Sequence, residues 1–313
     1  MKKLVFIYLF GLTTILSAQT ESDGIKMSKN YFCGGLAYNY SSWDHYWEGT
    51  FKRDNENIGR VSTSSVSVMG AYGVLDRLNI IFSLPYIKTN ASAGTLKGQQ
   101  GFQDISLFLK WLAFKKDADP SKYSIYAVSG GSASISNYSA DFLPMSIGLK
   151  SPTINLRLIG DYQFKHLFVT ASGNYIYRFN IKIDRAAYYT DKMIYSDEVN
   201  MPNAFTSKLG LGYRNGELII EGIVDSWNTL GGFDIRKNDM PFPSNKMNMM
   251  RTGINLKVPL GMAQRLSIIA NSFYTIQGRN IGQSASGTIG LFYIIPVKKN
   301  SGTSEISEPG KLQ

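Results

Sequence analysis

Apolar and polar side chains alternate with a period of two through much of the chain after residue 30. Between Leu78 and Tyr86 every second residue is apolar, and the same alternation runs from Ile105 to Trp111. A period of two places successive side chains on opposite faces of a β-strand, whereas a helix would repeat every 3.6 residues. The pattern predicts strands with one apolar face.

The same alternation can be followed to the end of the chain and predicts twelve strands. They span residues 31–43, 59–72, 78–86, 105–111, 123–129, 154–164, 167–179, 205–213, 218–227, 250–258, 266–277 and 289–295. In the second and ninth strands apolar and polar residues do not separate cleanly, so the pattern does not determine which of their faces points inward.

The connections between these strands alternate between five short ones and six longer ones. The short connections fall at residues 73–77, 115–122, 165–166, 215–216 and 260–264. Outer-membrane barrels have an even strand number, short periplasmic turns and long external loops, whereas a β-sandwich has no reason to sort its loops in this way. The sequence therefore predicts an all-β fold: a single antiparallel transmembrane β-barrel of about 12 strands. Nine aromatic residues near strand ends, Trp111 and Tyr213 among them, agree with interfacial girdles.

The N-terminus has the pattern of a secretory signal peptide. Lys2 and Lys3 precede an apolar stretch from Leu4 to Leu16, and small residues follow up to Ala18. We expect residues 1–18 to be the signal peptide, 19–297 the barrel and 298–313 a polar C-terminal tail. We also expect the polar residues 19–30 to lie in the periplasm.

Composition is consistent with a barrel and excludes several other classes of protein. The chain is 43% hydrophobic and 13% aromatic, with 30 Gly, and beyond the signal peptide it has no apolar run long enough for a spanning helix. The net charge is +10, but the basic residues are scattered, so we expect no nucleic acid partner. Cys33 is the single cysteine and is interpreted as an unreactive strand residue.

One stretch resembles a known family. The run YGVLDRLNIIFSLPYI from Tyr72, followed by GFQDISLFLKW ending at Trp111, resembles the outer-membrane family named for the MetA pathway of phenol degradation. The resemblance covers roughly 40 residues. It implies an outer-membrane barrel that passes small hydrophobic or aromatic compounds. The polar tail from Lys298 departs from the family, whose members usually end near the last strand.

By strand parity, one set of charged and aromatic side chains points into the barrel. The candidates for contact with a solute are Lys110, Arg157, Asp161, Arg178, Lys208, Glu221, Arg251, Lys257, Phe108 and Phe273. Arg or Lys facing lipid at the membrane midplane would cost about 2–4 kcal/mol, which favours the lumen. These charges could form a basic passage, or they could pair with one another and only stiffen the barrel. Asn255, Asn271, Leu112 and Ile269 share the same faces.

The leading hypothesis is passive diffusion of small hydrophobic or aromatic molecules, with outer-membrane lipid and the solute as partners and no cofactor. The alternatives are a structural or adhesive barrel that binds a partner through its long loops, and a barrel lipase or acyltransferase. The scarcity of catalytic residue types argues against an enzyme. His45 and His166 are the only histidines and are predicted at opposite ends of the barrel. The sequence does not determine the oligomeric state.

Overall fold

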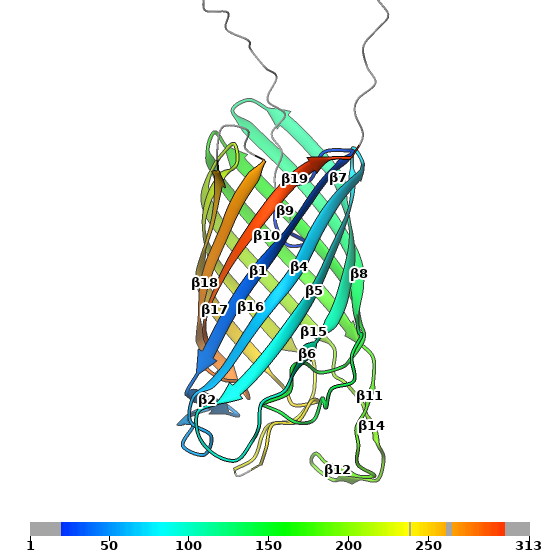
Figure 1. Cartoon of the computed structure of the whole chain (residues 1–313). Coiled ribbons are helices and arrows are strands. Elements are labelled where there is room, and N and C mark those ends of the chain that lie inside the picture. Colours follow the sequence, from blue (N-terminus) through cyan, green and yellow to red (C-terminus); the bar gives the residue numbers. More distant parts are fainter. Residues whose placement is uncertain (1–19, 238, 261–264, 298–313) are drawn as a thin grey trace, which may run out of the picture.

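Twelve long antiparallel strands close into one barrel in the computed structural model, which describes residues 20–237, 239–260 and 265–297 (Figure 1). Strand β1 pairs with β4 on one side and with β19 on the other, so no edge is left open. The barrel strands are β1 (Tyr31–Trp43), β4 (Val61–Leu75), β5 (Leu78–Ala91), β7 (Asp104–Ala118), β8 (Ser121–Ser134), β9 (Thr153–Phe164), β10 (Leu167–Arg178), β15 (Ala204–Asn215), β16 (Leu218–Thr229), β17 (Asn248–Leu260), β18 (Leu266–Arg279) and β19 (Ala285–Pro296). The predicted fold class is confirmed.

The connections separate to the two ends of the barrel as predicted. The short turns lie at the end where β1 begins and β19 ends, and the longer loops gather at the other end (Figure 1). We therefore assign the end with the short turns to the periplasm. Two predicted connections are shorter than expected because their strands continue: the turn between β7 and β8 shrinks to Asp119-Pro120, and residues 280–284 alone join β18 to β19.

The outer surface of the barrel is apolar, as contact with lipid requires. Leu156 and Leu158 on β9 are 58% and 65% exposed, while Ile159 on the same strand points to the lumen and is 1% exposed. The structure also orients the two ambiguous strands. Val66 of β4 and Ile220 of β16 face outward. Among the residues that the structure describes, no helix is long and apolar enough to cross a bilayer.

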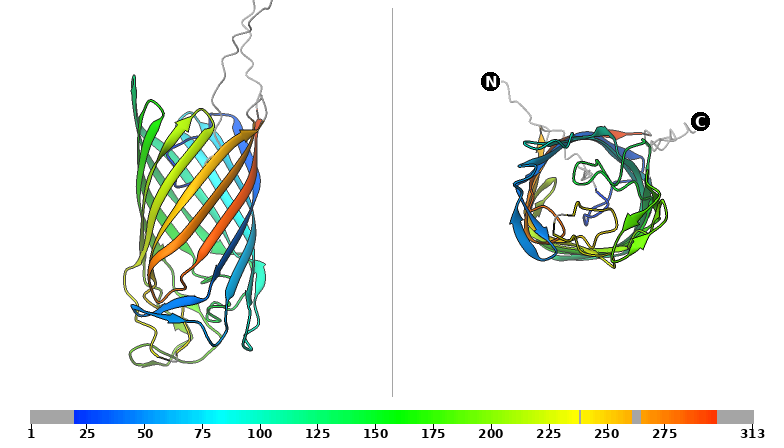
Figure 2. Two further views of the ribbon diagram at one scale, coloured as in Figure 1. Left: turned by 90° about the vertical axis from the view of Figure 1, so that its left-hand side faces the viewer. Right: turned by 90° about the horizontal axis from the view of Figure 1, so that it is seen from below.

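The N-terminal segment, residues 20–30, lies inside the barrel and not in the periplasm. Figure 2, seen along the barrel axis, shows this blue segment within the ring of strands. Met27 is fully buried and packs in a cluster with Cys33, Phe292 and Ile294 on the lumen side of β1 and β19. The predicted periplasmic position is wrong. The segment is polar, but so is the inside of the barrel, and polar backbone groups of the segment find partners there.

The long loops form a packed cap at the external end. A cluster of buried side chains joins the loop before β9, the loop between β10 and β15, and the loop between β16 and β17. The middle loop carries two small hairpins, β11 (Ile181–Lys182) with β14 (Glu198–Val199) and β12 (Tyr188–Tyr189) with β13 (Met193–Ile194). The cluster comprises Ala140, Ile181, Ile183, Tyr188, Val199, Met201 and Phe242.

Candidate functional site in the barrel lumen

Lys110 on β7 holds the start of the N-terminal segment. Its ammonium donates to the backbone oxygens of Thr20 at 2.9 Å and Asp23 at 2.7 Å, and to the Asp23 carboxylate at 2.7 Å. The Lys110 side chain is completely buried. Burial of a cation costs free energy unless polar atoms replace its water shell, and here three oxygen atoms do so.

Three further contacts fix the segment against the barrel wall. The Tyr126 hydroxyl donates to the Gly24 carbonyl at 3.1 Å, and the Asn79 amide donates to the Met27 carbonyl at 2.9 Å. Gly24 approaches the wall so closely that an added Cβ would lie 2.1 Å from Oδ1 of Asp161. Only glycine fits this close approach. Residues 20–30 therefore block part of the lumen at its periplasmic end.

The charged residues of the lumen are arranged mainly as ion pairs. The pairs are Lys110–Asp23 (2.7 Å), Arg157–Glu21 (3.8 Å), Lys208–Glu221 (3.5 Å), Arg214–Asp161 (3.0 Å), Arg251–Asp225 (2.7 Å) and Lys257–Glu217. Arg178 near the external end donates instead to the backbone oxygen of Pro202 at 3.2 Å. The sequence left open whether the lumen charges form a basic passage or pair with one another. The structure shows them mainly paired, although most of the anions are residues that were not predicted to lie in the lumen.

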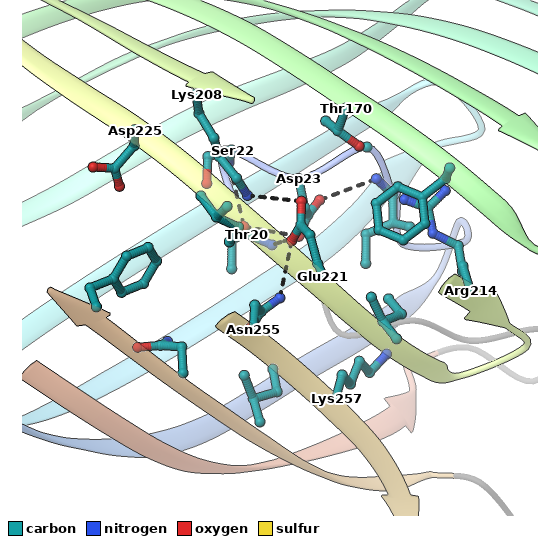
Figure 3. A pocket seen from close by; sticks show the side chains of 18 of the residues that line it. Thr20, Ser22, Asp23, Thr170, Lys208, Arg214, Glu221, Asp225, Asn255 and Lys257 are labelled. Carbon is teal, nitrogen blue, oxygen red and sulfur yellow. Dashed lines mark hydrogen bonds and ion pairs between the residues drawn. The ribbon is translucent and has the colours of Figure 1, made fainter. Parts of the chain in front are cut away.

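A cavity of about 260 Å³ lies between the N-terminal segment and the wall formed by β10 and β15 to β18 (Figure 3). Its apolar lining comes from Ile25, Phe168, Ile219, Ile223, Ile269 and Phe273. Its polar lining includes Lys208, Glu221, Asp225, Arg251, Asn255, Asn271 and Lys257. Ligand pockets for drug-sized molecules start near 300 Å³, so this cavity suits a smaller molecule, about the size of one ring.

All ten residues predicted from parity lie on the lumen side, but only half of them line this cavity. Lys208, Glu221, Arg251, Lys257 and Phe273 do so. The other five contact the N-terminal segment, the barrel wall or a loop. Lys110 and Arg157 bind the segment, and Asp161 binds Arg214 of the wall. Arg178 binds loop backbone, and Phe108 packs on the cluster of Leu112, Tyr126, Val128 and Ile159. Their contact with a solute stays a prediction.

Several residues of the site were missed by the sequence reasoning. Arg214 shares a strand face with Lys208 one residue beyond the predicted strand, and Asp225 shares a face with Glu221 inside the predicted ninth strand, so the parity argument carried further would have found both. Glu217 belongs to the turn between β15 and β16, and Glu21 and Asp23 belong to the segment before the first strand. Nothing in a strand pattern signals that these three residues enter the lumen.

The external loops are tied together by charged groups. Asp234 accepts hydrogen bonds from the Arg279 guanidinium at 2.7 and 2.5 Å and from the Asn280 amide at 2.7 Å. The bond from Arg279, with that from Asn280, holds the pKa of Asp234 below its ordinary value of 3.8, against the opposing effect of burial. Oδ1 of Asn280 also accepts from the amides of Gly49 and Ile235, so one residue joins three loops.

The two histidines lie at opposite ends of the barrel, as predicted. His45 begins the short external strand β2 (His45–Glu48), which pairs with β3 (Phe51–Asp54), and its ring nitrogens face Asp44 at 2.7 Å and Asp54 at 2.9 Å. Hydrogen bonds from His45 and then Arg60 lower the pKa of the exposed Asp44. His166 occupies a periplasmic turn. The two rings cannot act together at one site.

Comparison with known proteins identifies the fold. No family model matches the chain, and no curated protein matches its sequence. The COG4313 outer membrane channel from Pseudomonas putida F1 aligns with a TM-score of 0.68 at 12% identity, over 86% of this chain and 97% of that one. The translocator domain of autotransporter NalP from Neisseria meningitidis gives 0.42 at 12%, over 87% and 90%. The CymD monoaromatic hydrocarbon channel gives 0.37 at 10%, over 86% and 88%.

The first of these likenesses shows the fold, and the other two are too distant to add to it. A closed barrel of twelve strands with an apolar outer face and a charged lumen defines the class of protein: an outer-membrane β-barrel, with the fold of the COG4313 outer membrane channel. Its place is the outer membrane of a Gram-negative cell envelope.

Proposed function

We propose that this barrel lets small hydrophobic or aromatic molecules cross the outer membrane by passive diffusion. The observation that carries the proposal is the mixed lining of the lumen cavity, where six large apolar side chains share a space of about 260 Å³ with paired charges. A general water-filled porin has no use for such apolar lining. The resemblance of residues 72–111 to the MetA-pathway family supports the same class of solute.

Passage requires the N-terminal segment to move. Thr20, Asp23 and Gly24 form one side of the cavity and separate it from the opposite wall. The segment is held by ion pairs of Lys110 with Asp23 and Arg157 with Glu21, by hydrogen bonds from Tyr126 and Asn79 and by the packing of Met27, but it forms no strand. Such a segment can detach while the barrel, whose strands are fully paired, keeps its shape.

Uptake by whole cells tests the proposal, because a lipopolysaccharide leaflet slows the entry of hydrophobic solutes. Cells producing the barrel should take up radiolabelled ethylbenzene faster than cells without it, and uptake of arabinose should change little. A Lys110→Met variant should accelerate ethylbenzene further, whereas Lys116→Met, on an exposed part of the same strand, should behave as wild type. Equal ethylbenzene uptake in all four strains would refute the channel.

The alternative is a barrel that binds a surface partner through its loops. The feature in its favour is the hairpin of β12 and β13, which extends from the cap (Figure 1) and is followed by Tyr195, 86% exposed. Deletion of residues 188–195 distinguishes the two functions. A channel should keep its ethylbenzene uptake after this deletion, and an adhesive barrel should lose attachment to its partner.

A further inference from the structure

Glu221 on β16 is a buried carboxylate with long contacts. Its side chain is 6% exposed, yet its nearest donors among the described residues are the Asn255 amide at 3.3 Å and the Lys208 ammonium at 3.5 Å. Charge-assisted hydrogen bonds are normally about 2.7–2.9 Å. Lys208 has three N–H donors, and its partner among the described residues is this one carboxylate. Both members of the pair therefore have hydrogen-bonding capacity to spare.

The neighbouring lumen pairs differ in this respect. Asp225 accepts two hydrogen bonds from Arg251, at 2.9 and 2.7 Å. Asp161 accepts from Arg214 at 3.0 and 3.1 Å and from the Thr170 hydroxyl at 2.6 Å. Glu221 and Lys208 thus stand out from the charged groups around the cavity.

The backbone is shaped to hold the Glu221 carboxylate at the cavity wall. It lies over Gly210, where an added Cβ would be 1.9 Å from Oε1. Next to it, the Phe273 ring lies over Gly253, where a Cβ would be 2.4 Å from the ring. Ile223 is paired with both of these glycines, on β15 and on β17. A polar pair and an apolar surface therefore adjoin within one cavity (Figure 3).

We propose that Lys208 and Glu221 bind the hydroxyl group of the solute, a conclusion that rests on the proposed channel function and names its solute class. A hydroxyl group can donate to Glu221 and accept from Lys208 at once. The apolar part of the solute then lies against Ile223 and Phe273. A carboxylate in the same place would be repelled by Glu221 and could not donate a hydrogen bond to it, and a hydrocarbon would leave both members of the pair unsatisfied.

Binding measurements on the full-length mature barrel in lipid nanodiscs test this assignment. The probes share a phenyl group on a two-carbon chain: 2-phenylethanol, ethylbenzene and phenylacetate, with empty nanodiscs subtracted for partition into lipid. Wild type should bind 2-phenylethanol about tenfold more tightly than ethylbenzene, the effect of one hydrogen bond to a charged group, and phenylacetate most weakly. Equal affinity for the alcohol and the hydrocarbon would overturn the assignment.

Variants show whether the preference belongs to this pair. The double variant Lys208→Met and Glu221→Leu removes both charges together, so neither is left unpaired. It should lose the tenfold preference and keep its affinity for ethylbenzene. Glu221→Gln retains an acceptor and should lose less. Lys182→Met, on an external loop, should match wild type. A preference that survives in a double variant shown to be folded by its heat-dependent gel shift would also overturn the assignment.

Failure of this site and failure of the channel give different results. If ethylbenzene uptake by cells is accelerated while the nanodisc barrel shows no preference for the alcohol, the hydroxyl site is wrong and the channel stands. If the preference and its loss in the double variant are found while uptake of both probes is unaltered by the barrel, the site stands and diffusive transport is wrong.

Discussion

The ammonium of Lys110 lies 2.7 Å from the carboxylate of Asp23, although 87 residues separate the two in the sequence. The same ammonium binds two backbone oxygens of the segment that carries Asp23. One strand residue of the barrel wall therefore holds the segment that narrows the lumen, which makes this contact the natural place to test whether the segment moves.

Replacing Lys110 by Met should release the segment and expose the thiol beneath it. Cys33 is 2% exposed and packs beside Met27 of the segment. Removing one partner of a buried ion pair costs about 3–5 kcal/mol, and here that cost destabilises the position of the segment inside the barrel. We expect Cys33 to react with N-ethylmaleimide at least about tenfold faster in the variant, a ratio of about 1.4 kcal/mol, measured by mass spectrometry.

Two controls accompany this measurement. Lys116→Met should label at the wild-type rate, because Lys116 is exposed on β7. Cys33→Ser should not label at all. Equal labelling of wild type and Lys110→Met would mean that Lys110 does not keep the segment in place.

Replacing Gly24 by Ala should push the segment off the wall without changing a wall residue. The new Cβ would meet the Asp161 carboxylate at 2.1 Å, and that carboxylate cannot swing aside because Arg214 and Thr170 hold it. Overpacking of this kind costs about 1–3 kcal/mol. Single-channel recordings in planar bilayers should show a higher conductance than wild type. Gly222→Ala, where the nearest atom is 3.8 Å away, should conduct as wild type; the same rise in both variants would argue against a local clash.

The pair of Asp161 and Arg214 should stabilise the barrel only as a pair. Their side chains are 6% and 12% exposed, so Arg214→Met leaves a buried carboxylate without its cation. We expect the free energy of unfolding in lipid vesicles, measured by urea titration and tryptophan fluorescence, to fall by about 3–5 kcal/mol. The double variant with Asp161→Leu should recover part of this loss. The exposed Arg236, paired with Asp239, supplies the control Arg236→Met, which should leave the free energy of unfolding close to that of wild type. A single variant no less stable than the double one would contradict this account.

Acid should loosen one external loop at a pH below the ordinary carboxylate range. The pKa of Asp234 is lowered in the folded loop, so its contact with Arg279 is fully stabilising above the unfolded value of 3.8 and is lost as the pH falls through the lowered folded value. The Ile235 amide, which donates to Asn280 at 3.0 Å, reports on this contact. Its hydrogen-exchange protection should hold from pH 6 to pH 4 and decrease below that. In Asp234→Asn it should be low at every pH; undiminished protection in that variant would show that the ion pair does not hold the loop.

The sequence was sufficient to predict the barrel because the alternation that produces its strands is a local property of each segment. Lipid on one side and a polar lumen on the other impose a period of two on every strand, and Leu156 or Leu158 can be assigned to the lipid side from that period alone. Inward candidates such as Lys208 and Arg251 follow from the same alternation. The second and ninth strands could not be oriented, because each carries similar residues on both faces; pairing with their neighbours in the closed sheet decides their register.

The sequence by itself determined the class of fold, the orientation of the barrel, the separation of short turns from long loops and the lumen side of most strand residues. Only the tertiary structure decided what fills the lumen. Asp23 contacts Lys110 and Glu217 contacts Lys257 because closure of the barrel buries these two cations, and a buried cation requires a partner. The periodicity of the strands does not show this requirement, because it arises between residues far apart in the chain. The same requirement accounts for the position of residues 20–30 inside the barrel.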